Sequence, residues 1–309
     1  MKRLASIAGG VLALLCLGYF VVALRTHWEE IRAIATGPGA LAGMAVALLL
    51  YTATYLAGAK SWQLVLRTMG HAIGYRASLS IIAVSQLAKY LPGNVGHHFG
   101  RVLLARRAGL PADVTLTSVF LDTLLALAAS VACALGAWHL WPAIAALHGE
   151  ALARNLAIAA CAGIVLVALG FALRATRGHA HALLQRAAAL FQAGHRAASL
   201  MAWVSYLCSF ALGAAALAAI AGGLHAATPP MLELLAVYAI AWLVGFLVPG
   251  APAGLGVREA ILIFGLSPLL GRDVATATTA LMRVVTVAGD GLVFLLGSAM
   301  APRAAQAAT

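Results

Sequence analysis

The sequence predicts an all-α polytopic membrane protein: an inverted-topology repeat of six full transmembrane helices plus two re-entrant hairpins that are broken at Pro-Gly. Three observations support this prediction, namely the composition, the pattern of apolar runs and an internal repeat. Of the 309 residues, 63% are hydrophobic and only 9% are charged, and the mean hydropathy is +0.97. So little polar surface cannot cover a soluble fold, and a disordered chain would be less hydrophobic.

Six apolar runs are long enough to cross a bilayer, for which a helix needs about 20 residues. They are Leu4–Leu24, Gly39–Ala59, Val114–Trp138, Leu156–Leu173, Leu200–Gly223 and Val274–Met300. The first run is too long for the apolar region of a signal peptide, and no A-x-A cleavage site follows it directly. We therefore interpret it as a retained first span.

Two further apolar regions, 78–108 and 231–267, are each interrupted by Pro-Gly. Proline removes a backbone donor and glycine adds backbone freedom, so both end a helix. A broken helix at membrane depth is tolerated only where protein or a wet cavity satisfies the freed backbone groups. We therefore predict two re-entrant hairpins. Their turn and hinge positions are Pro92, Gly93, Gly96, Pro249, Gly250, Gly254 and Gly256.

The two broken regions resemble each other. In both, a glycine-rich stretch follows Pro-Gly, and an arginine stands nine residues after the proline, at Arg101 and Arg258, which are 157 residues apart. Pro111 and Pro268 repeat the same offset. We predict a single membrane domain, 1–309, with a first repeat at 1–138, an outside loop at 139–155 and a second repeat at 156–300. Three full crossings in each half invert the second half, as in many transporters with sites near the midplane.

The net charge of +11 indicates orientation. If the N-terminus lies inside, twelve of the 20 Lys and Arg residues fall in inside segments, four fall outside and four lie at membrane depth. This excess fits the positive-inside rule and predicts that both termini are cytoplasmic. Abundant alanine and the preference for Arg over Lys favour a bacterial plasma (inner) membrane. Since topology accounts for the charge, we expect no nucleic-acid partner.

Ionisable residues at membrane depth are the candidate functional residues, because each costs about 2.5–3.5 kcal/mol to insert. Arginine forks suit phosphate and carboxylate groups, so a cationic, glycine-lined cavity indicates an anionic headgroup. The predicted substrate-binding residues are Lys89, Asn94, Arg101, Arg258, Glu259 and Arg283. We expect Asp122 and Asp290 to balance charge or couple protons, and structural ion pairs are the alternative role for some of these residues.

The sequence gives no sign of a metal, a cofactor or catalytic residues. The four cysteines stand singly in apolar runs, which does not suggest a zinc site or disulfide framework. His97 and His98 are adjacent, so they do not share a helix face, and no third ligand is near. We interpret them as polar hairpin residues, with proton coupling as the alternative. No Walker motif for ATP occurs.

The segment from Leu91 to Arg101, and the string Gly-Leu-Gly-Val-Arg-Glu at 254–259 followed by Arg283, resemble a known family. This is the lysylphosphatidylglycerol synthase transmembrane (flippase-like) family, which includes the flippase domain of the multiple peptide resistance factor. The resemblance implies translocation of a lipid from the inner to the outer leaflet, in the prototype an aminoacylated phosphatidylglycerol. Because the chain stops at Thr309, we expect no aminoacyl-transferase domain and no synthase activity.

The leading hypothesis is a flippase or transporter for a phospholipid or a lipid-linked glycan, whose anionic or zwitterionic headgroup lies between the two hairpins. Its partners would be membrane lipids, a lipid-modifying synthase and further copies of the chain. The alternatives are a membrane-embedded enzyme acting on a lipid phosphate, a non-catalytic partner of a lipid synthase, and a soluble-anion transporter.

Overall fold

The structure is a computed structural model. It covers residues 37–90, 96–136, 194–224, 229–248 and 251–300, together with the single residues Arg25, Glu29, Gln192 and Ala226. All secondary structure in these residues is helical, as predicted. The predicted spans Leu4–Leu24 and Leu156–Leu173 and the loop 139–155 lie outside the described residues.

Four long helices correspond to four of the predicted spans. They are α3 (Pro38–Thr68), α6 (Ala112–Gly136), α10 (Arg196–Gly223) and α13 (Arg272–Met300). Helix α3 extends nine residues beyond the predicted end of its span at Ala59, because the polar residues that follow, including Lys60 and Gln63, are good helix formers. All four helices are long and apolar enough to cross a membrane.

The two regions that we predicted to be broken are broken. The first consists of α4 (Tyr75–Ser85), η1 (Gln86–Tyr90) and α5 (Gly96–Arg107). The second consists of α11 (Met231–Leu247), η3 (Pro252–Gly254) and α12 (Val257–Leu270). The helical segments end at Tyr90 and Leu247, shortly before the two Pro-Gly pairs. Pro252–Leu270 is also long and apolar enough to cross, whereas α11 is shorter, so the hairpins stay a prediction.

Helices α3 and α10 form the longest contact in the described part of the molecule and run antiparallel to each other. The start of α3 meets the end of α10 at two glycines. A Cβ atom on Gly43 would collide with the carbonyl oxygen of Ala219, and one on Gly223 would collide with that of Gly39. Small residues of this kind let two membrane helices approach closely.

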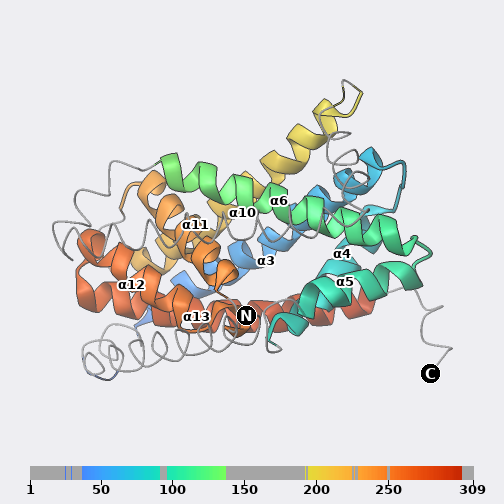
Figure 1. Ribbon diagram of the computed structural model, residues 1–309. Coiled ribbons are helices and arrows are strands. Elements are labelled where there is room, and N and C mark those ends of the chain that lie inside the picture. Colours follow the sequence, from blue (N-terminus) through green and yellow to red (C-terminus); the bar gives the residue numbers. More distant parts are fainter. Residues whose placement is uncertain are drawn as a thin grey trace, which may run out of the picture.

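Each broken region packs against a long helix that is distant in sequence. Helix α4 lies along α13, where the Ser80 hydroxyl donates a 2.8 Å hydrogen bond to the carbonyl oxygen of Gly297. Helix α11 lies along α6, and Leu232 comes close to Gly136. Figure 1 shows α4 and α5 toward one end of the long helices and α11 and α12 toward the other.

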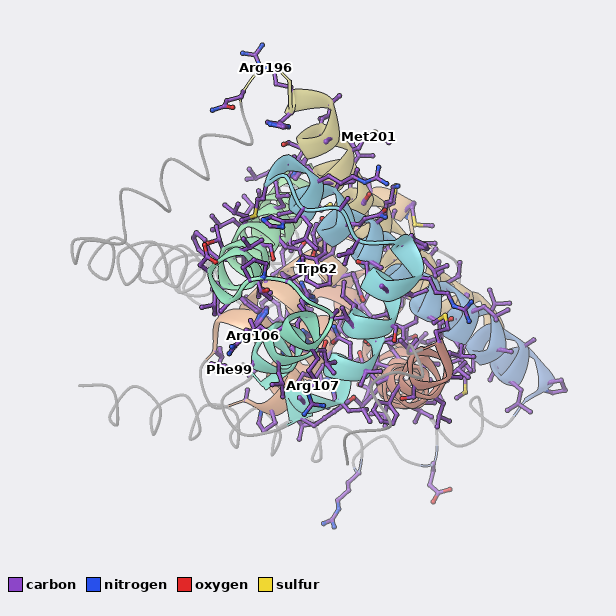
Figure 2. The ribbon with its side chains drawn as sticks, turned by 90° about the vertical axis from the view of Figure 1, so that its right-hand side faces the viewer. Trp62, Phe99, Arg106, Arg107, Arg196 and Met201 are labelled. Carbon is purple, nitrogen blue, oxygen red and sulfur yellow. The ribbon has the colours of Figure 1, made fainter. Side chains whose placement is uncertain are left out.

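The two ends of the bundle differ in charge. At the end where α4 begins and α5 finishes, exposed or half-buried bases belong to four helices: Arg67, Arg76, Arg106, Arg107 and Arg196. Figure 2 looks onto this end and labels three of them at the outside of the ribbon, whereas Trp62 lies among the helices. At the opposite end, the first turns of α11 and α13 carry Glu233, Arg272 and Asp273.

Candidate functional site

A cavity of about 160 Å³ lies in the middle of the bundle, between α3, α6 and α10 and the two broken regions. Its wall includes three of the predicted bases: Lys89 from η1, Arg101 from α5 and Arg258 from α12. The structure therefore brings together cations that are up to 169 residues apart in the sequence. This cavity is the candidate site. Whether each base can bind a ligand depends on the acid with which that base pairs.

Lys89 forms an ion pair with Asp290 of α13, with an Nζ–Oδ2 distance of 2.8 Å. The carboxylate also accepts hydrogen bonds from the hydroxyls of Tyr51 (2.8 Å) and Tyr90 (2.6 Å), and from that of Tyr55. Asp290 is completely buried. Four donors to one buried carboxylate stabilise its charged form, so both members of this pair are fully engaged.

Arg101 forms an ion pair with Asp122 of α6, with an Nη1–Oδ2 distance of 2.6 Å. Asp122 also accepts hydrogen bonds from the hydroxyls of Ser61 (2.9 Å) and Tyr206 (2.8 Å). The guanidinium lies over the ring of Trp62, 5.4 Å from its centroid. Both charges are almost completely buried, and the stacking and the hydrogen bonds offset part of their desolvation cost.

Arg283 forms an ion pair with Glu259, with an Nη1–Oε1 distance of 3.1 Å. The other carboxylate oxygen of Glu259 accepts a 2.6 Å hydrogen bond from the backbone N–H of Gly256 and so caps the start of α12. These two predicted substrate-binding residues line a smaller cavity of about 40 Å³ rather than the central one. Arg283 does not pair with Asp290, although both lie in α13.

Arg258 is the exception among the predicted bases, because the described residues offer it no acidic partner. Its Nε atom is buried without a hydrogen bond. A Cβ atom on Gly245 would lie 2.5 Å from the Cγ atom of Arg258, and one on Gly254 would lie 2.8 Å from its Nε atom. The two glycines thus leave just enough space for the side chain. Arg258 lines both cavities.

Three of the predicted hinge glycines fall in the described residues. Gly254 and Gly256 have φ angles of +70° and +80°, which glycine adopts without strain. A Cβ atom on Gly96 would collide with the backbone of Ala88, so glycine is required for α5 to start beside η1. The other predicted positions of the two turns lie outside the described residues: Pro92, Gly93, Asn94, Pro249 and Gly250.

His97 and His98 lie in the cavity wall, with ring centroids 3.9 Å apart. The Nδ1 atom of each ring is buried without a hydrogen-bond partner. In the described part of the chain, no three His, Cys, Asp or Glu residues are grouped so that they could hold a metal ion. The two histidines therefore add hydrogen-bonding capacity to the cavity.

Sequence reasoning missed the aromatic part of the wall. Trp242 stacks on Phe246 with ring centroids 5.3 Å apart, and Phe210 contacts both Trp242 and Tyr238 edge-on. These rings come from α10 and α11 and line the central cavity together with the bases. The spacing of Tyr238, Trp242 and Phe246, four residues apart, places them on one face of a helix. That spacing was the available signal.

Comparison with known proteins gives one match. The family model for the lysylphosphatidylglycerol synthase TM region matches residues 6–295, nearly the whole chain. A search of curated proteins found no match. The matched region includes every predicted site residue and both cavities.

Proposed function

Since the chain belongs to the lysylphosphatidylglycerol synthase transmembrane family, we propose that it moves a membrane lipid between the two leaflets. In this proposal Arg258 binds the phosphate of the lipid headgroup in the central cavity. The observation that carries the proposal is the position of Arg258: it lies at the junction of two cavities, and it has no acidic partner among the described residues.

Arg258 is half-buried, with a buried Nε atom. A cation that is largely withdrawn from water without a counter-ion is costly, and the cost falls when an anion binds beside it. Guanidinium is well suited to phosphate, because its planar fork can donate two parallel hydrogen bonds. Lys89, Arg101 and Arg283 already use their charges on acids of the protein. Among the described residues, Arg258 is therefore the predicted base whose charge is left for a ligand, and the other three contribute to the electrostatic potential around it.

The inverted repeat gives this site a route to both leaflets. It is supported by the offset of 157 residues and by the reciprocal packing of α4 on α13 and of α11 on α6. In this arrangement the two broken regions are re-entrant hairpins that enter from opposite faces and meet at the cavity. Rocking of one half against the other would open the cavity to each leaflet in turn.

The orientation follows from the charge of the two ends. The end that carries Arg67, Arg76 and Arg106 is the cytoplasmic one, because short cytoplasmic loops collect Lys and Arg. The end that carries Glu233, Arg272 and Asp273 then faces outward. In this orientation the first hairpin enters from the cytoplasmic face of a bacterial inner membrane.

The test is lipid movement in reconstituted vesicles. Purified protein is placed in phosphatidylcholine vesicles that contain phosphatidylglycerol labelled on its acyl chain, and a membrane-impermeant reductant quenches the label in the outer leaflet. We expect quenching to go beyond the outer leaflet quickly with wild-type protein and Arg107→Gln, which changes an exposed base, and much more slowly with Arg258→Gln. Equal movement by wild-type protein and Arg258→Gln would refute the assignment of the phosphate site.

Two further measurements on the same vesicles separate the alternative functions. A change in the chemical structure of the recovered lipid would indicate a membrane-embedded enzyme. Release of trapped inorganic phosphate, without movement of the labelled lipid, would indicate a soluble-anion transporter. We expect an unchanged lipid and retained phosphate.

A further inference from the structure

The central cavity has a defined charge balance. Lys89 and Asp290 cancel each other, as do Arg101 and Asp122. Arg258 adds one positive charge that no acid of the described residues cancels. With neutral histidines, the charged groups at the cavity therefore sum to +1.

Neither carboxylate at the cavity is available to a ligand. Asp290 accepts hydrogen bonds from Lys89 and three tyrosine hydroxyls, and Asp122 accepts them from Arg101, Ser61 and Tyr206. To form an ion pair with a ligand ammonium group, one of these carboxylates would have to give up its own base and leave that base alone. Breaking a buried ion pair is far more costly than leaving it intact.

With neutral histidines, the rest of the wall carries no charged side chain. Phe210, Tyr238, Trp242 and Phe246 present a continuous set of rings, whose faces pack against the C–H groups of an alcohol or a sugar. Around them, the unpartnered Nδ1 atoms of His97 and His98 supply hydrogen-bonding sites for hydroxyl groups.

From these features we infer that the lipid carries one net negative charge: a phosphodiester whose second substituent is an uncharged alcohol or sugar. This inference rests on the proposed function and identifies the substrate class for it. A headgroup of charge −1 gives a neutral complex in the buried cavity. A zwitterionic headgroup leaves one uncompensated positive charge, and an aminoacylated headgroup of charge +1 leaves two. Movement should therefore be fastest for the anionic lipid and slowest for the aminoacylated one.

The experiment compares three lipids with the same acyl-chain label in the same phosphatidylcholine vesicles: phosphatidylglycerol, phosphatidylcholine and lysylphosphatidylglycerol. We expect each additional positive charge on the headgroup to slow protein-dependent movement by about tenfold or more. If the lysylated lipid moves as fast as phosphatidylglycerol, the inference is wrong and the proposed function stands. If no lipid moves faster than in protein-free vesicles, the proposed function itself is wrong.

A variant pair tests whether Arg258 is the source of this preference. Arg258→Gln lowers the charge of the cavity to zero, so the ratio of phosphatidylglycerol to phosphatidylcholine movement should fall toward one. Arg258→Lys keeps the charge and should keep a ratio well above one. The ratio is measured on protein that elutes as a single species in gel filtration, and a wild-type ratio in Arg258→Gln would overturn the role of Arg258. If Arg258→Gln does not fold, the inference is tested by the three-lipid series and by the ratio of phosphatidylglycerol to phosphatidylcholine movement in Arg258→Lys.

Discussion

Arg101 and Arg258 occupy corresponding places in the two broken regions, nine residues after the proline of each Pro-Gly pair, but their surroundings differ. Asp122, 21 residues after Arg101, pairs with it, whereas 21 residues after Arg258 the chain has Thr279. If the alignment slips by three residues, the corresponding position is Met282, which is not acidic either. One copy of the repeated arginine is therefore held in a buried ion pair, and the other has no acidic partner among the described residues.

The comparison predicts different roles for the two arginines: Arg101 should contribute to stability and Arg258 to lipid movement. The largest expected effect is that of Asp122→Asn, which leaves Arg101 buried beside a neutral partner. Removing one member of a buried ion pair costs about 3–5 kcal/mol in the free energy of unfolding. The measurement is chemical unfolding in detergent, followed by tryptophan fluorescence.

Arg258→Gln is the matched control for this experiment. It removes a base that has no acidic partner in the described part of the chain, so the free energy of unfolding should not fall. Equal losses of stability in the two variants would show that both arginines are structural, and the contrast between the repeats would then be wrong.

The next effect comes from giving the second arginine the acid that the first one has. Thr279 is buried and lines the smaller cavity with Arg258. Thr279→Asp should therefore supply a carboxylate that neutralises the charge of Arg258. We expect movement of labelled phosphatidylglycerol to slow by about tenfold or more, equivalent to at least about 1.4 kcal/mol. Thr279→Asn has the same shape without the charge and should keep most of the activity.

If Thr279→Asn were as slow as Thr279→Asp, the loss would come from altered packing of α13 rather than from the charge. If both moved lipid at the wild-type rate, Arg258 would not hold the phosphate.

The sequence was sufficient to predict the long helices and the position of the breaks. Apolar runs of about 20 residues predicted α3, α6, α10 and α13, and the Pro-Gly pairs predicted helix ends close to Tyr90 and Leu247. These features depend on local composition and on the missing N–H of proline, so they can be read without knowing the tertiary structure.

The partners of the charged residues could not be predicted in the same way. Lys89 and Asp290 are 201 residues apart, and Arg283 pairs with Glu259 although Asp290 stands on its own helix. Which acid meets which base depends on how the helices pack. Three of the four bases predicted at membrane depth line one cavity, but the sequence did not separate Arg258 from the three bases that pair with acids.

A smaller effect is expected where the second arginine is held in place. The Cβ atom of Gly245→Ala would lie 2.5 Å from the Cγ atom of Arg258, so the side chain must shift to an unfavourable rotamer. Such a rotamer costs about 0.5–1.5 kcal/mol, and we expect lipid movement to slow a few-fold. Gly291→Ala, on α13, meets nothing within 4 Å and serves as the control. Equal rates for the two variants would show that the position of Arg258 is not critical.

The smallest effect concerns the first arginine. Ser61→Ala removes one of the hydrogen bonds to Asp122 and leaves those from Arg101 and Tyr206. The free energy of unfolding should fall by about 1 kcal/mol. Headgroup preference should not change, because the Arg101–Asp122 pair stays intact. Ser130→Ala is the control, since that buried hydroxyl bonds only to the carbonyl oxygen of Leu127 in its own helix. A changed headgroup preference in Ser61→Ala would mean that Arg101 also contacts the lipid, and the two repeats would then share the substrate.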